Sequence, residues 1–295
     1  PVRKHALSVL SYADPVFSYS QCRPIVDRTG RVFAVLAGRP QDSSWDSVNG
    51  EIQQIFDVAR DTYAIDPRLL KHRRGQYSAI GCGLSYGGGQ QSVSNLSHSP
   101  HNGSVVDSLL RQRAVQRVAN FSDSAMQLFA PRLYSYYEST LHQLLEHDRE
   151  LRPNFPKNVF GAATFNLGPR TVTYTHRDHL NLPFGWCSVT AIGDFDPVSG
   201  GHLVLWDLKM LIEFPPGSTV LIPSALLLHS NCAIAEQERR YSFTQYSAGG
   251  LFRWVECGFQ PMNRLSREEQ RQVRLNGARF WERGVGMLSL WSELA

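Results

Sequence analysis

The stretch TVTYTHRD at residues 171–178 ends in a histidine and an aspartate separated by one residue. In a β-strand, side chains two residues apart project to the same face, so His176 and Asp178 are predicted to point together. A second histidine, His229, lies near the end of the β-rich run STVLIPSALLLHS at residues 218–230. If intervening barrel strands bring His229 beside His176, the three side chains form the facial triad of non-haem Fe(II) oxygenases.

The run RYSFTQYS at residues 240–247 supplies a second part of the same site. Its even-numbered residues are polar, and they are predicted to share the barrel-facing side of a strand. A facial triad leaves three coordination positions open, which suit the keto and C1 carboxylate oxygens of 2-oxoglutarate and dioxygen. Arg240 and the hydroxyl of Ser242 would hold the distal carboxylate of 2-oxoglutarate. A slip of one residue would put Arg239 in place of Arg240, and this alternative stays open.

Short β-rich runs broken by glycine and proline follow Pro153 and predict a sandwich or barrel. The strand candidates are residues 159–167, 171–178, 186–195, 202–208, 218–230 and 240–247. Before Pro153, apolar residues at helical spacing predict helices instead. These helices are expected at residues 44–63, 107–120 and 122–150, with Pro131 kinking or interrupting the third. The Gly/Ser/Asn-rich stretch from residue 81 to 104 is expected to be a loop, and residues 266–284 a final charged helix with a solvated face.

Composition limits the class of protein. With 295 residues, 42% hydrophobic and 19% charged, the chain is neither disordered nor a coiled coil, and no apolar run approaches the ~18 residues of a membrane span. Five scattered cysteines without a C-x-x-C pair argue against a disulfide scaffold or a thiolate zinc site and favour a reducing compartment. The N-terminal stretch PVRKHALSVLSYADP has no sustained apolar region, so we expect no secretion signal.

A basic cluster at residues 68–74 gathers three arginines, a lysine and a histidine. Basic groups gathered on one surface suit nucleic acid, whereas a general preference for arginine over lysine in the chain could reflect codon usage alone. The glycines of GCGLSYGGG at residues 81–89 match neither the P-loop nor the dinucleotide-binding spacing, so both motifs are rejected.

Taken together, these motifs resemble the TET/JBP family of Fe(II)/2-oxoglutarate nucleic-acid dioxygenases, in particular its fungal, transposon-associated branch. The resemblance covers roughly Arg73 to Phe259. The matching segments are HRRGQYSAIGCGLSYGGGQ, NVFGAATFNLGPRTVTYTHRDHLNLPFGWCSVTAIGDFDPVSGGHLVLWDL, FPPGSTVLIPSALLLHSN and RRYSFTQYSAGGLFRWVECGF.

The resemblance implies an α+β protein with a double-stranded β-helix (jelly-roll) core, a helical N-terminal layer and a C-terminal helix. The expected parts are a DNA-contacting region at residues 1–152, a catalytic core at residues 153–260 and a C-terminal helix at residues 261–295, integrated in one catalytic domain. Fe(II) would be held by His176, Asp178 and His229, and 2-oxoglutarate by Arg240 and Ser242 with a contact from His202; dioxygen is the other co-substrate.

The resemblance also implies a substrate, methylated double-stranded DNA, whose target base is flipped into the barrel. Asn181 and Tyr246 match positions of the base pocket. Backbone and groove contacts are assigned to Arg73, Arg74 and the loop glycines Gly87, Gly88 and Gly89. A nuclear location, action as a monomer and no membrane association are expected with this function.

The sequence departs from the family at Ala248, where animal and protist members have a base-contacting histidine. The smaller side chain leaves room for a purine, so N6-methyladenine stands beside 5-methylcytosine as a candidate substrate. Two rival functions stay open: an oxygenase that hydroxylates a protein or small molecule, and a non-catalytic reader of modified bases. The intact triad and the anchoring arginine argue against the reader.

Overall fold

The structure is a computed structural model that describes residues 8–10 and 22–294. The expectation about a secretion signal falls almost entirely outside these residues. The largest element is an eight-stranded sheet with the strand order β2-β3-β12-β9-β14-β8-β6-β7. Its strands are β2 (Arg23–Val26), β3 (Val32–Gly38), β6 (Ala79–Ser85), β7 (Ser94–Asn95), β8 (Ala162–Asn166), β9 (Cys187–Asp194), β12 (Thr219–Ile222) and β14 (Arg239–Tyr246). Every pairing in this sheet is antiparallel.

A smaller, four-stranded sheet has the order β1-β11-β10-β13. Its strands are β1 (Ser8–Leu10), β10 (Leu203–Leu205), β11 (Met210–Ile212) and β13 (His229–Asn231), and a separate two-stranded pair joins β4 (Lys71–His72) to β5 (Gly75–Gln76). Apolar side chains of the two larger sheets share one core cluster, in which Leu203 and Leu205 of β10 meet Val220 and Ile222 of β12. The two sheets therefore enclose a common interior.

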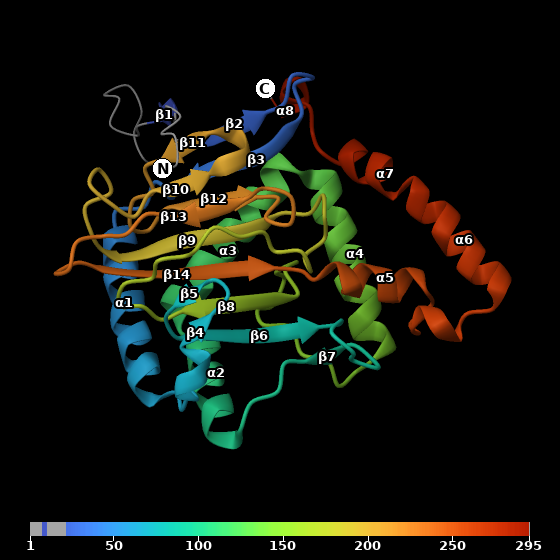
Figure 1. Cartoon of the computed structure of the whole chain (residues 1–295), viewed down its shortest axis with the longest axis horizontal. Helices are drawn as coiled ribbons and strands as arrows, with labels where there is room; N and C mark the ends of the chain where they lie inside the picture. The colour runs from blue at the N-terminus through green and yellow to red at the C-terminus, as the bar shows by residue number, and fades with distance from the viewer. Residues whose placement is uncertain (1–7, 11–21, 295) are drawn as a thin grey trace, which may run out of the picture.

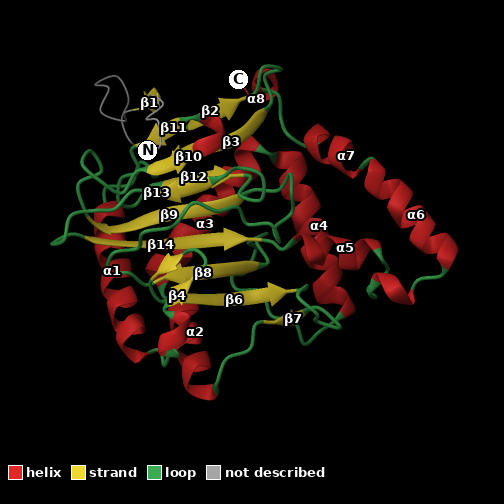
Figure 2. Ribbon diagram, viewed as in Figure 1, coloured by secondary structure: helices red, strands yellow, loops and turns green. Residues whose placement is uncertain are grey.

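The helices are α1 (Trp45–Thr62), α2 (Pro100–Arg111), α3 (Arg113–Phe129), α4 (Pro131–His147), α5 (Gly249–Glu256), α6 (Arg267–Ala278), α7 (Phe280–Gly286) and α8 (Trp291–Leu294), with short 3-10 turns η1 (Pro67–Leu69), η2 (Trp206–Leu208) and η3 (Met262–Arg264). Helices such as α1 and α3 cover the other face of the large sheet, while α6 and α7 lie beyond its edge, and Figure 2 shows all helices in red. The buried stripe of α1 packs on β8 and β14, where Phe56 meets the rings of Phe165 and Tyr241 edge-on. This packing turns one face of β14 toward the helices and leaves the other for the interior.

The helix predictions hold for residues 44–63, which form α1, and for the interruption at Pro131, which is the first residue of α4. The helix expected at residues 107–120 is wrong, because the chain breaks at Gln112, whose backbone is extended. Part of the expected loop is helical as well, since Ser99 caps α2 through the backbone N–H of Asn102. Proline at the first position of α2 fits the helix start at no cost in hydrogen bonds.

The prediction of a strand at residues 171–178 is also wrong, since this segment makes isolated bridges only, among them His176 with His229. Pro223 divides the expected strand 218–230 into β12 and β13, because proline cannot continue the ladder. The run at 202–208 yields the short strand β10 followed by η2.

Strands from both sides of residue 153 lie in one sheet. β3 pairs with β12, and β6 pairs with β8, so the segments 1–152 and 153–260 share their β-structure (Figure 1). Mixed helices and antiparallel sheets agree with the expected α+β class. In the part of the chain that the structure describes, no helix has both the length and the apolar character needed to cross a bilayer.

Candidate functional site

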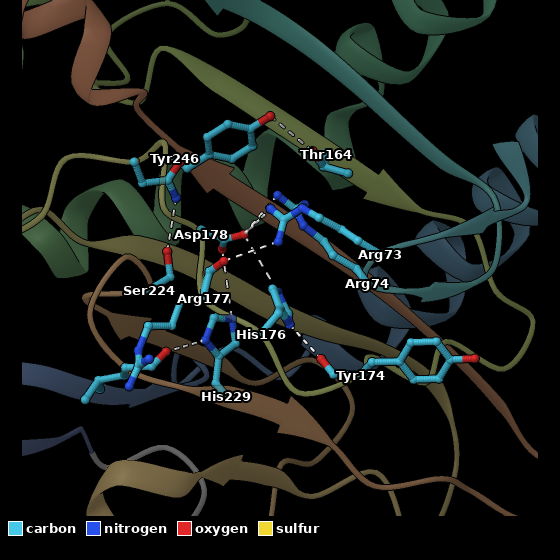
Figure 3. A network of polar contacts seen from close by, with 12 residues as sticks. Arg73, Arg74, Thr164, Tyr174, His176, Arg177, Asp178, Ser224, His229 and Tyr246 are labelled. Carbon is cyan, nitrogen blue, oxygen red and sulfur yellow. Dashed lines mark hydrogen bonds and ion pairs between the residues drawn. The ribbon is translucent and has the colours of Figure 1, made fainter. Parts of the chain in front are cut away.

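His176, Asp178 and His229 come together between the two sheets (Figure 3). Each offers one ligand atom, and the three atoms lie within 4.8 Å of one another. The Nε2 atom of His176 is 3.7 Å from Oδ1 of Asp178, and the Nε2 atom of His229 is 3.9 Å from Oδ2. Two imidazoles and one carboxylate at this spacing form a potential metal site with one open face.

Backbone hydrogen bonds, and not a regular strand, bring the triad together. His176 donates its N–H to the carbonyl of His229 and accepts the N–H of His229 in return, both at 3.0 Å. The N–H of Asp178 donates to the carbonyl of Ser224 at 2.9 Å. The segment that carries the first two ligands is thus joined to the chain leading into β13 at two points on either side of Arg177.

Both imidazoles are oriented by their Nδ1 atoms. Nδ1 of His176 lies 2.7 Å from the carbonyl oxygen of Tyr174, and Nδ1 of His229 lies 2.8 Å from that of Leu227. A carbonyl can only accept, so each Nδ1 carries the proton and each Nε2 has a lone pair available for a metal ion between the histidines and Asp178. Such hydrogen bonds to the second ring nitrogen fix the orientation and tautomer of metal-binding histidines.

Burial keeps the histidines neutral and the aspartate ionised. Desolvation and the neighbouring His229 lower the pKa of His176 to about 4, and burial likewise lowers the pKa of His229. For Asp178, burial alone would raise the pKa, but Arg74 and the two imidazoles outweigh it and the net pKa is lowered. These are the protonation states that metal binding requires.

Arg73 and Arg74 approach Asp178 from the hairpin β4–β5. The guanidinium of Arg74 lies 2.9 Å from Oδ1 of Asp178, and that of Arg73 lies 3.6 Å from the same atom. Arg73 also donates to the carbonyl of Arg177 at 3.2 Å. The structure therefore places this part of the basic cluster at the mouth of the metal site, while Arg68 pairs with Asp66 at the surface.

A second group of polar side chains lines the same cavity, contributed mainly by β14. Arg240 is 2% exposed, and its Nη1 donates to the carbonyl of Thr171 at 3.2 Å. Its guanidinium also lies over the rings of Phe195 and Phe214. Ser242, two residues on, accepts a hydrogen bond from Asn166 at 2.9 Å and lines the cavity beside Arg240. Burial lowers the pKa of Arg240 to about 10, which still leaves it charged at neutral pH.

The register of β14 separates the two neighbouring arginines. Arg240 faces the cavity, whereas Arg239 is exposed and pairs with Asp57 of α1 at 2.9 Å. His202 directly precedes β10, whose first residue Leu203 lines the cavity, and its contact with 2-oxoglutarate stays a prediction.

Asn181 and Ala248 lie opposite each other in an isolated antiparallel bridge. The side-chain amide of Asn181 donates to the hydroxyl of Ser224 at 3.0 Å, next to the backbone bond that holds Asp178. Tyr246 shares the cavity-facing side of β14, and its hydroxyl reaches toward Thr164 at 3.4 Å (Figure 3). These residues gather at the opposite end of β14 from Arg240.

The glycines Gly87, Gly88 and Gly89 all have positive φ, and a Cβ added to any of them would meet nothing within 4 Å. They follow β6 at the edge of the molecule near α5, where the carbonyl of Tyr86 closely approaches Gly250. The loop therefore lies at the same end of the sheet as Tyr246, although no contact joins it to the cavity in the described residues.

Sequence reasoning missed several residues that build the site. Arg177 donates to the carbonyl of Leu226 at 2.6 Å and pairs with Asp207 at 3.0 Å, and Asp207 also accepts the N–H of Leu228 at 2.6 Å. Asn231 binds the backbone of residues 171–173 through its amide. The positions of Arg177, between two ligands, and of Asn231, directly after LLLHS, can be read from the sequence. Their partners cannot, because they are distant in sequence.

The residues present fit Fe(II) with 2-oxoglutarate and dioxygen. Oδ1 of Asp178 is buried, and its close contact is the ion pair with Arg74, which favours the ionised carboxylate that a metal ligand needs. Nε of Arg240 is buried without a hydrogen-bond partner, and no carboxylate of the described chain pairs with this arginine. A buried cation without an anion is costly, and the distal carboxylate of a bound 2-oxo acid would offset that cost.

No protein-family model matches the sequence, and no curated protein matches it. A structure of NgTET1 in complex with 5mC DNA has a TM-score of 0.45 at 14% identity, covering 78% of this chain and 77% of that one.

Two other similar structures are also oxygenases. An oxidoreductase of the 2OG-Fe(II) oxygenase family from Burkholderia pseudomallei has a TM-score of 0.36 at 15% identity, covering 67% of this chain and 79% of that one. The viral collagen prolyl hydroxylase vCPH from Paramecium Bursaria Chlorella virus-1, in its 2OG complex, has a TM-score of 0.25 at 14% identity and covers 38% of this chain and 70% of that one. Likenesses this distant do not establish an activity, which has to be inferred from the site itself.

Proposed function

We propose that this protein is an Fe(II)/2-oxoglutarate-dependent dioxygenase that oxidises the methyl group of 5-methylcytosine in DNA. The observation that carries the proposal is one cavity lined by both a buried His-Asp-His cluster and a buried arginine that no carboxylate of the described chain neutralises. In this proposal the two facing sheets are those of a double-stranded β-helix. The chain would act in the nucleus, as a monomer.

Different residues of the cavity would bind the metal and 2-oxoglutarate. His176, Asp178 and His229 would hold the metal, which together with 2-oxoglutarate and dioxygen supplies the chemistry that places oxygen on a C–H bond. Arg240 would receive the distal carboxylate of 2-oxoglutarate as a fork of donors, and the hydroxyl of Ser242 has a proton to add because its oxygen already accepts from Asn166. Apolar side chains complete the cavity wall and exclude water; they belong to Val189, Leu203 and Phe214.

Asn181 supports the assignment of a base as substrate. Its amide nitrogen is engaged by Ser224, which leaves the amide oxygen to accept a hydrogen bond. Cytosine and adenine both carry an exocyclic amino group that can donate to such an oxygen. Because Asp178 is only 8% exposed, a base inside a duplex could not reach the site without being flipped out of the stack.

Ala248 favours a second candidate substrate, N6-methyladenine. Ala248 lies opposite Asn181 in the isolated bridge, and its side chain is a single methyl group. A purine is larger than a pyrimidine, so an alanine here relaxes the selection by size. We therefore propose 5-methylcytosine as the main substrate and N6-methyladenine as the second.

The exposed basic residues around the mouth would meet the backbone of the nucleic acid. Arg73 is the more exposed of the two arginines beside Asp178. In the proposal it contacts phosphate once the base has entered, while Arg74 stays with the carboxylate. The loop of Gly87, Gly88 and Gly89 would follow the groove, since its open backbone lets a ligand approach closely.

Mass spectrometry of nucleosides tests the proposal. Duplexes with 5-methylcytosine, N6-methyladenine or no modification are incubated with the protein, Fe(II) and 2-oxoglutarate, and oxidised nucleosides and succinate are measured. Oxidised base in step with succinate is expected for the methylated duplexes. Succinate without oxidised base, or succinate indifferent to DNA, would favour a protein or small-molecule hydroxylase, and no succinate with retained binding would favour a reader.

The variant Asn181→Ala sharpens this test. A lost base contact of ~1 to 3 kcal/mol lowers kcat/KM on methylated DNA by about 10-fold or more. If Asn181 instead supports Ser224 and the iron site, the variant will lose Fe(II) affinity to a similar degree. Measuring Fe(II) binding beside turnover separates these two roles.

A further inference from the structure

The helix α6 stands apart from the body of the protein (Figure 1). None of its described side chains is buried, and Gln270 and Val273 alone among them are partly covered. Its neighbour α7 is anchored, since Phe280 packs on the ring of Phe184. A capping box formed by Ser266 and Glu269 begins α6. Local capping thus helps a helix that gains little from packing, whereas most protein helices depend on a buried face.

Three arginines form a stripe on α6: Arg267, Arg271 and Arg274. At 3.6 residues per turn, the positions i, i+4 and i+7 fall within an arc of about 60°. All three are exposed. Arg274 reaches Gln270 on its own helix at 3.4 Å, and within residues 8–10 and 22–294 no salt bridge holds any member of the stripe.

Some other surface arginines of the protein have acidic partners, and others, such as Arg28, make no salt bridge within the described residues; the stripe differs in gathering three arginines on one helix face. Arg132 pairs with Glu293 at 2.9 Å, and Arg177 pairs with Asp207 at 3.0 Å. On α6 itself, Glu269 is used by the capping box. The stripe is therefore a local excess of positive charge whose complement is not supplied by the described part of the fold.

We propose that the arginine stripe of α6 binds the phosphate backbone of double-stranded DNA outside the catalytic cavity. This inference rests on the proposed function for the choice of partner. Arg267 and Arg274 are seven residues apart, which is about 10 Å along a helix. That distance equals about three nucleotide steps of one DNA strand, so successive arginines can reach separate phosphates.

The path of the chain supports a partner shared with the catalytic site. β14 carries Arg240 near its start and Tyr246 at its end, and α5, η3 and α6 follow without another strand. α6 therefore extends from the end of β14 at which Asn181 and Ala248 meet. A duplex whose flipped base enters there has flanking nucleotides that can run toward α6.

An anionic membrane is the less suitable occupant. A helix that lies on a bilayer needs an apolar face opposite its basic one. The apolar side chains of α6 that the structure describes are Val273 and Leu275, and they lie about 160° apart around the helix. They form no continuous face, whereas the arginines do.

Fluorescence anisotropy on an unmethylated duplex of about 30 base pairs, or three helical turns, tests the inference with the full chain. The variant with Arg267→Gln, Arg271→Gln and Arg274→Gln removes the stripe. Each lost phosphate contact reduces the slope of log K against log salt by about 0.9, so a reduction of up to about 2.7 is expected. The corresponding triple lysine variant should retain most of the slope, because it retains the charge.

A matched control removes the same charge elsewhere, through Arg28→Gln, Arg111→Gln and Arg113→Gln, three exposed arginines on other elements. This control should leave the slope almost unchanged. Equal effects of the two triple variants, or none from either, would overturn the inference, as would a wild-type chain that does not bind the duplex. Loss of binding to phosphatidylserine vesicles with an unchanged DNA slope would assign the stripe to a membrane instead.

Turnover of 2-oxoglutarate on methylated duplex, measured in parallel, keeps the two proposals apart. If the stripe variant changes the salt slope but the wild-type protein oxidises no base, the proposed function fails and the stripe remains a DNA-binding surface. If the wild-type protein oxidises methylated DNA and the slope does not change, the stripe assignment alone fails.

Discussion

At the level of single side chains, the two imidazoles are already in their metal-binding form. The carbonyls of Tyr174 and Leu227 fix the proton on Nδ1, and burial lowers the pKa of both rings. Asp178 is kept ionised by Arg74 and by the imidazoles, against its own burial. The site is therefore organised for a divalent cation by the chain itself.

Replacing any member of the triad should abolish activity, because the described chain offers three ligands at this site. We expect His176→Ala, Asp178→Ala and His229→Ala each to lose most Fe(II) while keeping the far-UV circular dichroism of the wild type. Iron content and succinate formation are the measurements. The exposed neighbour His179 provides the control His179→Ala, which should retain iron. Near-normal iron in any triad variant would show that the ligand assignment is wrong.

Replacing Arg240, which pairs with no carboxylate of the described chain, should weaken the binding of 2-oxoglutarate but should not lower the stability of the unliganded protein. Removing one member of a buried charge pair costs about 3 to 5 kcal/mol, so Arg240→Met should raise the KM for 2-oxoglutarate by about 100-fold or more. Without ligand, the same variant should have an equal or higher Tm, because a desolvated charge is gone.

Arg239→Met serves as the control for Arg240→Met. Arg239 is exposed and pairs with Asp57, so its loss should leave the KM for 2-oxoglutarate within about 2-fold, given that surface pairs contribute about 1 kcal/mol or less. Thermal melts with and without 2-oxoglutarate complete the comparison. A larger effect at Arg239 than at Arg240 would contradict the register of β14.

Ala248 should control the choice between the two methylated bases. Ala248→His places a larger side chain with a hydrogen-bonding group opposite Asn181. If one base contact amounts to ~1 to 3 kcal/mol, the ratio of kcat/KM for 5-methylcytosine over N6-methyladenine should rise by about 10-fold. Competition between the two duplexes in one reaction measures the ratio directly. Ala248→Gly, which adds no side chain, should leave the ratio nearly as it is.

At the level of elements, the register of β14 fixes the positions of the residues that line the cavity. The strand pairs with β9 on one side and β8 on the other, so its register is fixed from both edges. Tyr241 and Phe243 pack toward α1, which commits the alternate residues to the cavity. The strand thereby spaces the proposed 2-oxoglutarate anchor from the proposed base pocket.

The ion pair of Arg177 with Asp207 links the segment of the first two ligands to the segment that precedes His229. Loss of such outer contacts typically lowers metal affinity by 10- to 100-fold, and we expect this for Arg177→Ala and for Asp207→Ala. Because the two side chains act as a unit, the double variant should lose no more than the worse single one. Fe(II) titration gives the three affinities. Additive losses would indicate that Asp207 acts through Leu228 independently of Arg177.

At the level of the whole molecule, the large sheet draws its strands from distant parts of the chain. β3 covers one side of β12, and β6 covers one side of β8. Val35 and Leu36 of β3 are almost fully buried. The β-structure of residues 153–260 consequently depends on β3, which precedes this segment by more than a hundred positions.

A fragment of residues 153–260 should therefore not fold by itself. It would expose the edges of β12 and β8, and unpaired edges of apolar strands promote aggregation. We expect poor dispersion in the amide NMR spectrum or precipitation for this fragment, and a cooperative thermal transition for residues 22–294. A well-dispersed spectrum for residues 153–260 would show that the N-terminal strands are dispensable.

Local chemistry explains what could be predicted. The α1 helix, the break at Pro131 and the alternation along β14 all follow from periods of 3.6 or 2 and from the geometry of proline. The identity of the ligand set follows from residue types alone. These are properties of short segments, and the periodicity of a short segment can be read directly from its sequence.

Long-range pairing explains what could not be predicted from the sequence. His176 and Asp178 were expected to converge because a strand would carry them, yet a single bridge to His229 and a bond to Ser224 hold them in place. The approach of Arg74 to Asp178 has no local signal either.

The sequence by itself determined which side chains could bind a metal and a carboxylate, and the alternation of polar and aromatic residues along β14, while it left Arg239 and Arg240 as alternatives. Only the tertiary structure decided that Arg240, and not Arg239, shares one cavity with the triad and that Asn181 meets Ala248. The physical reason is that side-chain chemistry and strand alternation are local properties, whereas the meeting of distant segments depends on sheet topology, which hydrogen bonds and burial across the whole chain select together.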